Sequence, residues 1–556
     1  MDYEATAAVA AYVYTPLSQP QGIRVATLLP GVKTDPLRVS IHEHDLNDTN
    51  LQYEAVSYCW GSVHRTCQIM CDDRAIMVTE NLVAALLRFR NLTHQRVLWI
   101  DSICIDQNAI EERNHQVKLM GNVYQRANRV LIWLGEEGPT TELAYSFMRA
   151  YGELSLTDDW EIFETSARYL LRSASKDEKC QVLQEFCETF EVPPPRSTEV
   201  AAFLALLDRP WFSRAWTYQE CKLARERLFV TGSHEIQGSL VASFQLDSLN
   251  LHGEADLSES AVIFIRCMNA MYHMLKDVPL SFGGILENGF WGNLRFLLSV
   301  RRGTKAHDPR DIVYSLLGVA SQFNVMEIAP DYVVSWQNLY TSVTRQIICN
   351  TKNLTVLADA IKPSKNLSSL PTWVPDWSQP LTSQTFSRAE DGLFPRWKAS
   401  GTSVVHIIHN EDPSKLQLRG LRCDRVKRTD LSREEINEHL TSYRLPSKLE
   451  LFDEGHKNFV TEGGLLGVGP QYVEISDGVY ILLGSRVPHL LRKAENENEF
   501  SFVGECHVHD LMQGEALLQA KKTADPSLSY YDASAFLWSL CDLEDMPFET
   551  EEVILI

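Results

Sequence analysis

The stretch Leu98–Gln107, with the sequence LWIDSICIDQ, decides the predicted fold. It begins with large apolar residues that are typical of a buried strand, and it ends in polar side chains. Residues 111–120 (EERNHQVKLM) follow with the apolar spacing of an amphipathic helix. Open α/β sheets bind ligands where their strands end and their helices begin. This junction is therefore the expected location of a functional site.

The neighbouring segments repeat the order of strand followed by helix. Apolar runs predict strands at 53–58, 67–71, 97–100, 130–134 and 227–231. Helical spacing predicts a helix from Thr79, as N-cap, to Asn91, and a second helix opened by a capping box of Asn108 and Glu111. Strands that alternate with helices indicate a parallel sheet. We predict an α/β domain over residues 1–235, with a helical insertion at about 138–209.

The remaining chain divides into two regions that differ in the spacing of their apolar residues. Residues 236–380 have mainly helical spacing. After Leu370–Trp377 (LPTWVPDW), alternating patterns predict strands at 404–409, 415–426, 479–483 and 500–509. A Gly-rich turn is expected within Gly463–Gly469. Residues 381–556 are therefore predicted to form a smaller, mostly β domain.

Length and charge narrow the class of protein. A chain of 556 residues exceeds what one hydrophobic core usually supports, so two or three domains are expected. The formal net charge of −21 argues against nucleic acid as a partner, since that partner requires a basic surface. The composition is that of an ordinary folded protein.

No targeting, membrane or metal signal stands out. The N-terminus lacks the positive region of a secretory signal, and no apolar run is long enough to span a bilayer. Twelve scattered cysteines favour reduced thiols and a cytoplasmic location. The segments His42–His44 and Cys506–His509 contain metal-binding residue types but lack further ligands, so no metal site is predicted.

Three ordered blocks resemble the signature blocks of the fungal heterokaryon incompatibility (HET) domain: Tyr53–Gly61, Leu98–Gln107 with Glu112 and Arg113, and Arg214–Glu220. The flanking segments Asp308–Asp311, Leu370–Trp377 and Val503–Glu515 resemble the corresponding parts of long HET proteins, so the resemblance covers most of the chain. It implies a cytosolic fungal protein of non-self recognition that can trigger cell death, with self-association into a homo-oligomer and a protein partner.

The resemblance also implies a fold and a chemistry. HET domains are similar to Toll/interleukin-1 receptor (TIR) domains, which have a flavodoxin-like α/β fold. Some TIR domains cleave the nicotinamide–ribose bond of NAD+, which makes NAD+ a candidate substrate here. Their catalytic glutamate follows a tryptophan on the same helix, and Trp216 and Glu220 have a similar arrangement. By this analogy, Glu220 is the catalytic candidate.

The residues themselves allow two roles for Glu220. On a helix, Trp216 and Glu220 share a face, and apolar neighbours raise the pKa of a carboxyl group. A fixed carboxylate can stabilise the positive charge that develops on ribose when an N-glycosidic bond breaks. Alternatively, Glu220 pairs with Arg214 or Arg113 as a structural brace, a common reason for a perturbed carboxylate.

The candidate ligand contacts are Tyr58, Trp60, Asp101, Asp106, Gln107, Arg113 and Trp216. The aromatic residues can stack on flat bases, or they pack in turns and core. The acids and Gln107 face a ligand at a strand end, or they hydrogen-bond their own loop. Arg113 reaches the same crevice, or it pairs with a nearby acid such as Glu112.

Two function hypotheses follow. The chain is either a TIR-like enzyme that consumes NAD+, or a non-enzymatic module that acts by self-association and partner binding. An open crevice at Glu220 beside Asp101 and Trp60 would favour the enzyme. A closed core in which Glu220 meets an arginine would favour the module.

Overall fold

The structure is a computed structural model. It describes residues 9–61, 64–157, 187–194, 197–242, 289–321, 326–360, 369–380, 397–436, 455–527 and 550–556 apart from 406, 409, 433 and 525, together with a few isolated positions between these ranges.

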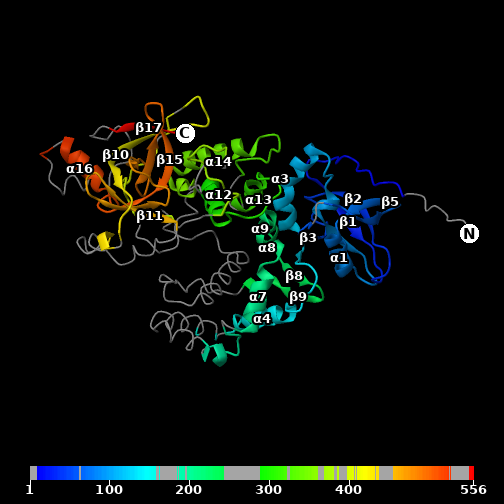
Figure 1. The fold of residues 1–556 in the computed structure, drawn as a ribbon. Coiled ribbons are helices and arrows are strands. Elements are labelled where there is room, and N and C mark those ends of the chain that lie inside the picture. The colour runs from blue at the N-terminus through cyan, green and yellow to red at the C-terminus, as the bar shows by residue number, and fades with distance from the viewer. Residues whose placement is uncertain are drawn as a thin grey trace, which may run out of the picture. The chain divides into compact units, whose positions relative to one another are not determined.

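The chain divides into two compact units. The first comprises residues 1–279, 305–307 and 313–332, and the second comprises residues 280–304, 308–312 and 333–556. In Figure 1 the blue and cyan elements belong to the first unit, and the yellow and orange strands belong to the second.

The first unit is built on a nine-stranded sheet of the described residues, in the order β5-β4-β2-β1-β6-β3-β7-β8-β9. The strands are β1 (Gly22–Leu28), β2 (Arg38–Asp45), β3 (Glu54–Tyr58), β4 (Cys67–Cys71), β5 (Arg74–Val78), β6 (Arg96–Trp99), β7 (Val130–Trp133), β8 (Arg227–Thr231) and β9 (His234–Gln237).

Four central strands, β6-β3-β7-β8, are parallel, as predicted from their apolar runs. Their order, numbered along the chain, is 2-1-3-4. The expectation of a parallel sheet is wrong for the flanks. There β1 pairs antiparallel with both β2 and β6, and β9 pairs antiparallel with β8. The sheet is therefore mixed.

Helices pack on both faces of this sheet. On one face, α1 (Glu80–Phe89) places the Phe89 ring edge-on to Trp133, with ring centroids 6.1 Å apart. On the other face, α3 (Ile110–Arg126) packs Tyr124 against Trp99. The short helix α9 (Ala215–Lys222) contacts α3, β3 and β7. This face is the one that carries the candidate site.

The helix ends agree with the prediction in one case and differ in another. The Thr79 hydroxyl accepts a hydrogen bond from the Leu82 N–H, as expected of an N-cap. The predicted capping box at Asn108 is wrong, because the N-cap of α3 is Ala109, whose side chain cannot accept a hydrogen bond. Instead, Asp106 accepts from the Asn108 N–H and orders the loop before the helix.

Further helices complete the first unit: α2 (Asp101–Cys104), α4 (Thr141–Leu154), α7 (Thr198–Leu207), α8 (Pro210–Ser213), α10 (Gly238–Ala242) and α13 (Asp311–Ala320). Helices α4 and α7 lie within the predicted insertion and contact each other, while residues 163–183 of the insertion lie outside the described residues. The Gly318 N–H donates to the Gln219 side chain over 2.9 Å, which ties α13 to α9.

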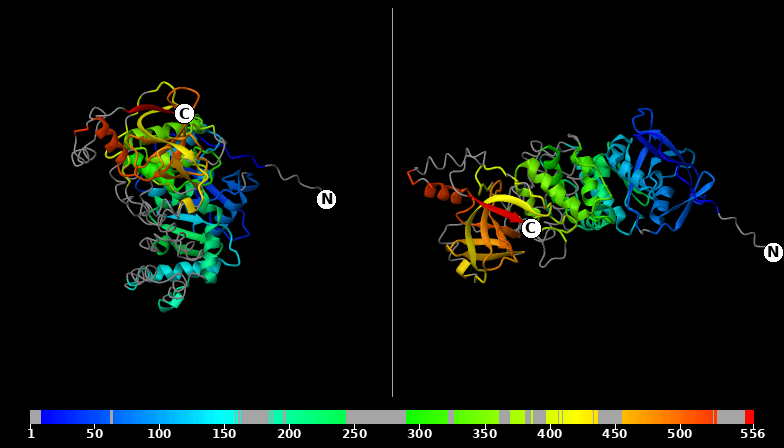
Figure 2. Two further views of the ribbon diagram at one scale, coloured as in Figure 1. Left: turned by 60° about the vertical axis from the view of Figure 1, so that its left-hand side comes forward. Right: turned by 90° about the horizontal axis from the view of Figure 1, so that it is seen from above.

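The alternating patterns predicted a mostly β domain, and the structure forms these strands into a small β-barrel in the second unit. Its strands are β10 (Leu416–Arg428), β11 (His456–Thr461), β12 (Leu466–Pro470), β13 (Gly478–Leu482), β14 (His489–Lys493), β15 (Glu499–Glu505), β16 (His507–Val508) and β17 (Glu551–Leu555). Strands β10, β13, β14, β15 and β17 form a closed ring, and the other strands extend from β10. Figure 2 shows these strands curving around a common interior.

Helices α12 (Gly289–Val300), α14 (Trp336–Thr351), η3 (Thr355–Ala360) and α16 (Glu515–Ala524) belong to the same unit. The predicted strand at 404–409 is wrong. Among its described residues only Ile408 pairs, in an isolated bridge with Gln417.

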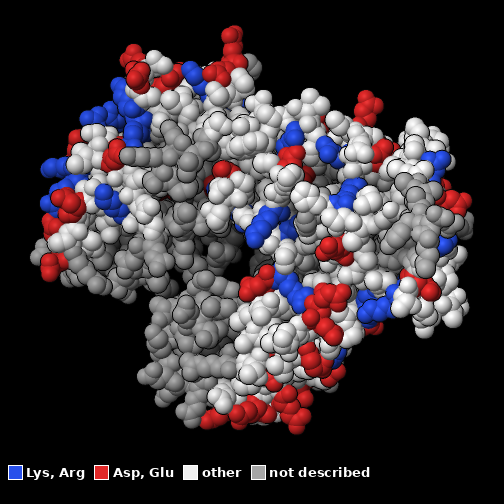
Figure 3. Space-filling view, turned by 45° about the vertical axis from the view of Figure 1, so that its right-hand side comes forward, with Lys and Arg blue, Asp and Glu red and all other residues white. Residues whose placement is uncertain are grey.

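The charge distribution, the helix lengths and the placement of possible ligands relate to the predictions on nucleic acid, membrane and metal. On the face shown in Figure 3, acidic side chains are interspersed with lysines and arginines. No described helix is long and apolar enough to cross a membrane. Within the described ranges, no group of three His, Cys, Asp or Glu side chains is placed to share a metal ion.

Candidate functional site

A buried carboxyl group lies at the centre of the candidate site. Glu220 on α9 is 4% exposed, and it accepts a hydrogen bond from the Ser57 hydroxyl on β3. The Trp211 indole N–H on α8 donates to the same hydroxyl oxygen over 2.8 Å. Trp211 and Ser57 are also almost fully buried. A chain of hydrogen bonds thus fixes Glu220 against the central strand of the sheet.

The surroundings of Glu220 set its protonation. Burial raises the pKa of Glu220 to about 7, since a charge is costly away from water. The positive charge of Arg214 and the Ser57 hydrogen bond oppose this shift, while the negative charge of Asp101 adds to it. Near neutral pH the carboxyl group is therefore divided between its acid and carboxylate forms, as general acids and bases require.

A second acid lies at the start of α2. The Trp60 indole N–H donates to Asp101 Oδ2 over 2.9 Å, and the Ser102 N–H donates to Oδ1 over 2.7 Å. Burial raises the pKa of Asp101, and Arg214 acts against this shift. The Tyr58 hydroxyl lies 2.6 Å from the Ser102 hydroxyl.

Arg214 connects the two acids. Its guanidinium donates to the Tyr58 carbonyl over 2.9 Å and lies 5.7 Å from the centre of the Trp60 ring. Burial lowers the pKa of Arg214, but the charges of Asp101 and Glu220 outweigh this and raise it. The guanidinium therefore stays charged between two acids whose own pKa values are raised.

The position of this cluster in the fold is significant. Tyr58 ends β3, and Asp101 follows the end of β6, so the cluster lies at the carboxyl ends of parallel strands. Strands β6 and β7 pair with opposite sides of β3, which makes β3 the point where the strand order reverses. Ligands of doubly wound sheets bind in the crevice at such a point.

The structure brings most of the predicted residues together. Tyr58, Trp60, Asp101 and Glu220 form the cluster, and Gln107 donates to the Asp101 carbonyl over 2.9 Å. Trp216 is buried on the same helix as Glu220. The Asp101 and Gln107 contacts support the loop itself, as the structural alternative expected; ligand contact by these residues stays a prediction.

Asp106 and Arg113 make their contacts elsewhere. The Asp106 carboxylate accepts from the Asn108 N–H within its own loop. The Arg113 guanidinium lies 4.7 Å from the centre of the Tyr332 ring. Glu112, considered above as a partner of Arg113, instead forms a two-pronged ion pair with Arg24, with distances of 2.6 and 2.9 Å.

Sequence reasoning missed Ser57 and Trp211. Ser57 lies inside the quoted block Tyr53–Gly61, but a single hydroxyl in an apolar strand gives no signal of what it contacts. Trp211 resembles an ordinary core residue. Side chains alternate between the two faces of a strand, so Ser57 lies on the opposite face of β3 from Val56 and Tyr58. This alternation was the one sequence signal that separated Ser57 from its neighbours.

Comparison with known proteins adds independent information. Residues 53–220 match a family model described as heterokaryon incompatibility protein (HET), and residues 424–525 match one described as Het-6 beta-barrel domain. The chain is 26% identical over 424 residues to heterokaryon incompatibility protein 6, OR allele, of Neurospora crassa. That alignment covers 66% of this chain and 58% of the relative, so the chain spans less than two thirds of the relative's length. No solved structure matches.

Proposed function

Since the chain carries a heterokaryon incompatibility (HET) domain and a Het-6 β-barrel domain, we propose that it acts in fungal non-self recognition and triggers cell death when activated. We further propose that Glu220 is the working group of the HET domain. The observation that supports this role is the position of a carboxyl group with a pKa of about 7 at the carboxyl ends of the central strands.

The chemistry that this cluster fits is cleavage of the nicotinamide–ribose bond of NAD+, in keeping with the TIR-like character that the HET resemblance implies. The C–N bond breaks and nicotinamide leaves with the electron pair. Water adds to the ribose carbon and releases a proton. Glu220 in its carboxylate form stabilises the positive ribose in this step. In this proposal Trp60, which is partly exposed beside Asp101, stacks on a flat ring of the substrate.

A second candidate function is a non-enzymatic assembly module. It is favoured by the 4% exposure of Glu220 and by the charge of Arg214 beside it, because a closed core gives a substrate no access. The two candidates differ in one respect. The enzyme requires α9 or its neighbours to move before NAD+ reaches Glu220, whereas the module requires no chemistry at this position.

Expression in a fungal host separates the candidates. We would measure viability and cellular NAD+ after induction of the parent chain, Glu220→Gln, and Glu235→Gln as a control for an exposed carboxylate on β9. Loss of viability and of NAD+ in the parent and in Glu235→Gln, but not in Glu220→Gln, supports the enzyme. If the parent chain kills cells without lowering NAD+, and Glu220→Gln kills them equally, the result supports the module. Full viability at every expression level contradicts a role in triggering death.

A further inference from the structure

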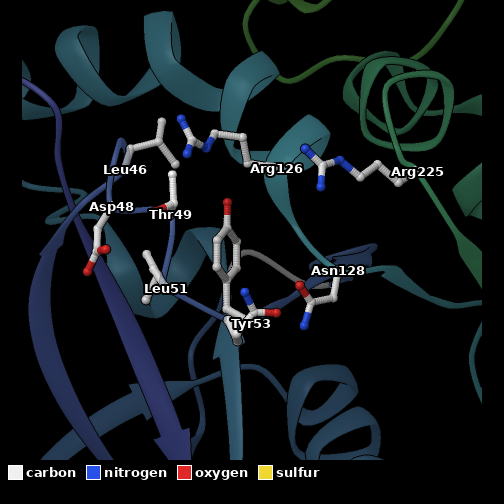
Figure 4. A pocket seen from close by; sticks show the side chains of 9 residues that line it. Leu46, Asp48, Thr49, Leu51, Tyr53, Arg126, Asn128 and Arg225 are labelled. Atoms are coloured by element: carbon white, nitrogen blue, oxygen red, sulfur yellow. The ribbon is translucent and has the colours of Figure 1, made fainter.

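A polar cavity lies at the opposite end of β3 from Glu220. It has a volume of about 250 Å³, and it is lined by Leu46, Asp48, Thr49, Leu51, Gln52, Tyr53, Arg126, Asn128 and Arg225. Most of these residues come from the segments that lead into β3, β7 and β8, so the cavity is at the amino ends of the parallel strands. Figure 4 shows the Tyr53 hydroxyl pointing toward Arg126.

A second hollow adjoins the first. It has a volume of about 320 Å³, shares Leu46, Arg126 and Arg225 with the first, and adds Gln21, Asn47, Asn122 and Gln125. The two arginines therefore line both hollows. The remaining lining is rich in amide side chains, which both donate and accept hydrogen bonds.

Two arginines and one acid, Asp48, line the cavity, so its charged side chains are positive on balance. In the part of the chain that the structure describes, neither has a carboxylate within ion-pair distance; Arg126 makes one long hydrogen bond, of 3.4 Å, to Asn47. Both arginines act to lower the pKa of the buried Tyr53 phenol, against the larger raising effect of burial. The positive electrostatic field of the two arginines thus extends to the Tyr53 phenol.

Two groups beside the arginines carry negative charge or partial negative charge, and both accept hydrogen bonds within the protein. The Asp48 carboxylate accepts hydrogen bonds from the backbone and side-chain nitrogens of Asn50, and in Figure 4 it points away from the arginines. The Val123 carbonyl, in the last turn of α3, accepts from the Tyr53 hydroxyl over 2.6 Å. Hydrogen bonding leaves the negative charge of Asp48 in place, so two arginines and one acid leave the cavity lining with one net positive charge to attract an anion.

We propose that this cavity binds a small organic phosphate through Arg126 and Arg225. Arginine is well suited to phosphate because its planar guanidinium donates paired hydrogen bonds. The amides of Gln52 and Asn128 in this cavity fit the hydroxyl groups of an attached sugar. This site is separate from Glu220 and goes beyond the proposed function, since ligands of this fold class are expected at the other strand end.

Calorimetric titration of the full chain at low ionic strength tests the proposal, with pyrophosphate, AMP and adenosine as probes. We expect saturable binding of AMP and pyrophosphate and none of adenosine. Arg126→Gln and Arg225→Gln each weaken binding by at least about 10-fold, as expected for loss of hydrogen bonds to a charged group. Arg38→Gln removes an exposed arginine on β2, outside the cavity, and leaves the affinity unchanged.

Melting temperatures of the variants confirm that each remains folded. Two outcomes would overturn the proposal. One is that neither AMP nor pyrophosphate shows saturable binding at millimolar concentration. The other is binding that Arg38→Gln weakens as much as the two cavity variants do, because that would indicate general attraction to positive charge. Glu220→Gln leaves AMP binding intact, so failure of the proposed enzyme activity and failure of this site are distinguishable.

Discussion

Glu220→Gln is the substitution that most directly reports on the buried carboxyl group. The amide oxygen of glutamine can still accept the Ser57 hydrogen bond, and its volume is nearly that of the acid. The substitution therefore removes the ionisation of residue 220 and leaves its packing in place. Its effect on stability is expected to depend on pH.

The magnitude follows from the pKa. Burial raises the pKa of Glu220 from its ordinary value of 4.5 to about 7, so the native state holds a proton that the unfolded chain releases between these values. The contribution of Glu220 to stability therefore falls as pH rises through this window. The loss is roughly 3 kcal/mol above pH 7 relative to pH 4.5 and below. Glu220→Gln lacks this loss, so it gains stability relative to the parent as pH rises.

The assay is urea unfolding of the parent and of the variant at a series of pH values. Hydrogen–deuterium exchange of peptides that cover β3 and α9 reports the stability of the first unit separately from that of the barrel. Taking the difference between the two proteins at each pH cancels groups that titrate equally in both. A difference that stays constant from pH 4.5 to pH 8 would refute the reasoning, because it would mean that Glu220 ionises as freely in the native state as in the unfolded chain.

Three further predictions concern packing and pairing. Arg24→Ala leaves the largely buried Glu112 carboxylate without its partner and should lower the free energy of unfolding by about 3 kcal/mol, read from urea denaturation; a loss below 1 kcal/mol would contradict a buried ion pair. Thr79→Ala removes the N-cap of α1 and should cost about 1 kcal/mol, while Thr79→Ser should restore most of it. Gly467→Ala places a Cβ 2.3 Å from the buried Phe459 ring, so the barrel should lose about 1–3 kcal/mol; an unchanged melting temperature would show that the ring can move aside.

The sequence predicted the centre of the first unit well. Strands β3, β6, β7 and β8 are short apolar runs that are buried on both faces, and such runs give the strongest local signal. Strand β1 was missed because Arg24 interrupts its apolar pattern. The structure explains this exception, since the Arg24 guanidinium is satisfied by Glu112 and by the Cys104 carbonyl, two partners far away in sequence.

The barrel shows the same dependence on distant contacts. Residues 463–469 resemble a glycine-rich turn, yet Leu466–Pro470 forms β12. Gly467 is accommodated in this strand because the Phe459 ring of the neighbouring strand fills the space where its side chain would be. In residues 404–409, apolar and polar side chains alternate as they do in a strand. This pattern indicates that one face of the segment is buried, but it does not provide a neighbouring strand with which the segment can pair.

The candidate site was predicted in its parts and not in its connections. The spacing of Trp216 and Glu220 predicted a shared helix, which the structure contains as α9. The polar end of Leu98–Gln107 does follow the end of a parallel strand, β6. The link through Ser57 to Trp211 joins residues 154 positions apart, and no local pattern reports such a contact. Arg214 was expected to pair with Glu220, but its guanidinium donates to the Tyr58 carbonyl and lies over the Trp60 ring.

The most direct test of the central claim is release of nicotinamide from NAD+ by the purified full chain at high protein concentration, with Glu220→Gln and Glu235→Gln beside it. We expect release by the parent and by Glu235→Gln, and loss of release in a folded Glu220→Gln. Release that persists in Glu220→Gln, or no release by the parent at any concentration, would contradict the assignment of Glu220 as the working group of an NAD+-cleaving site.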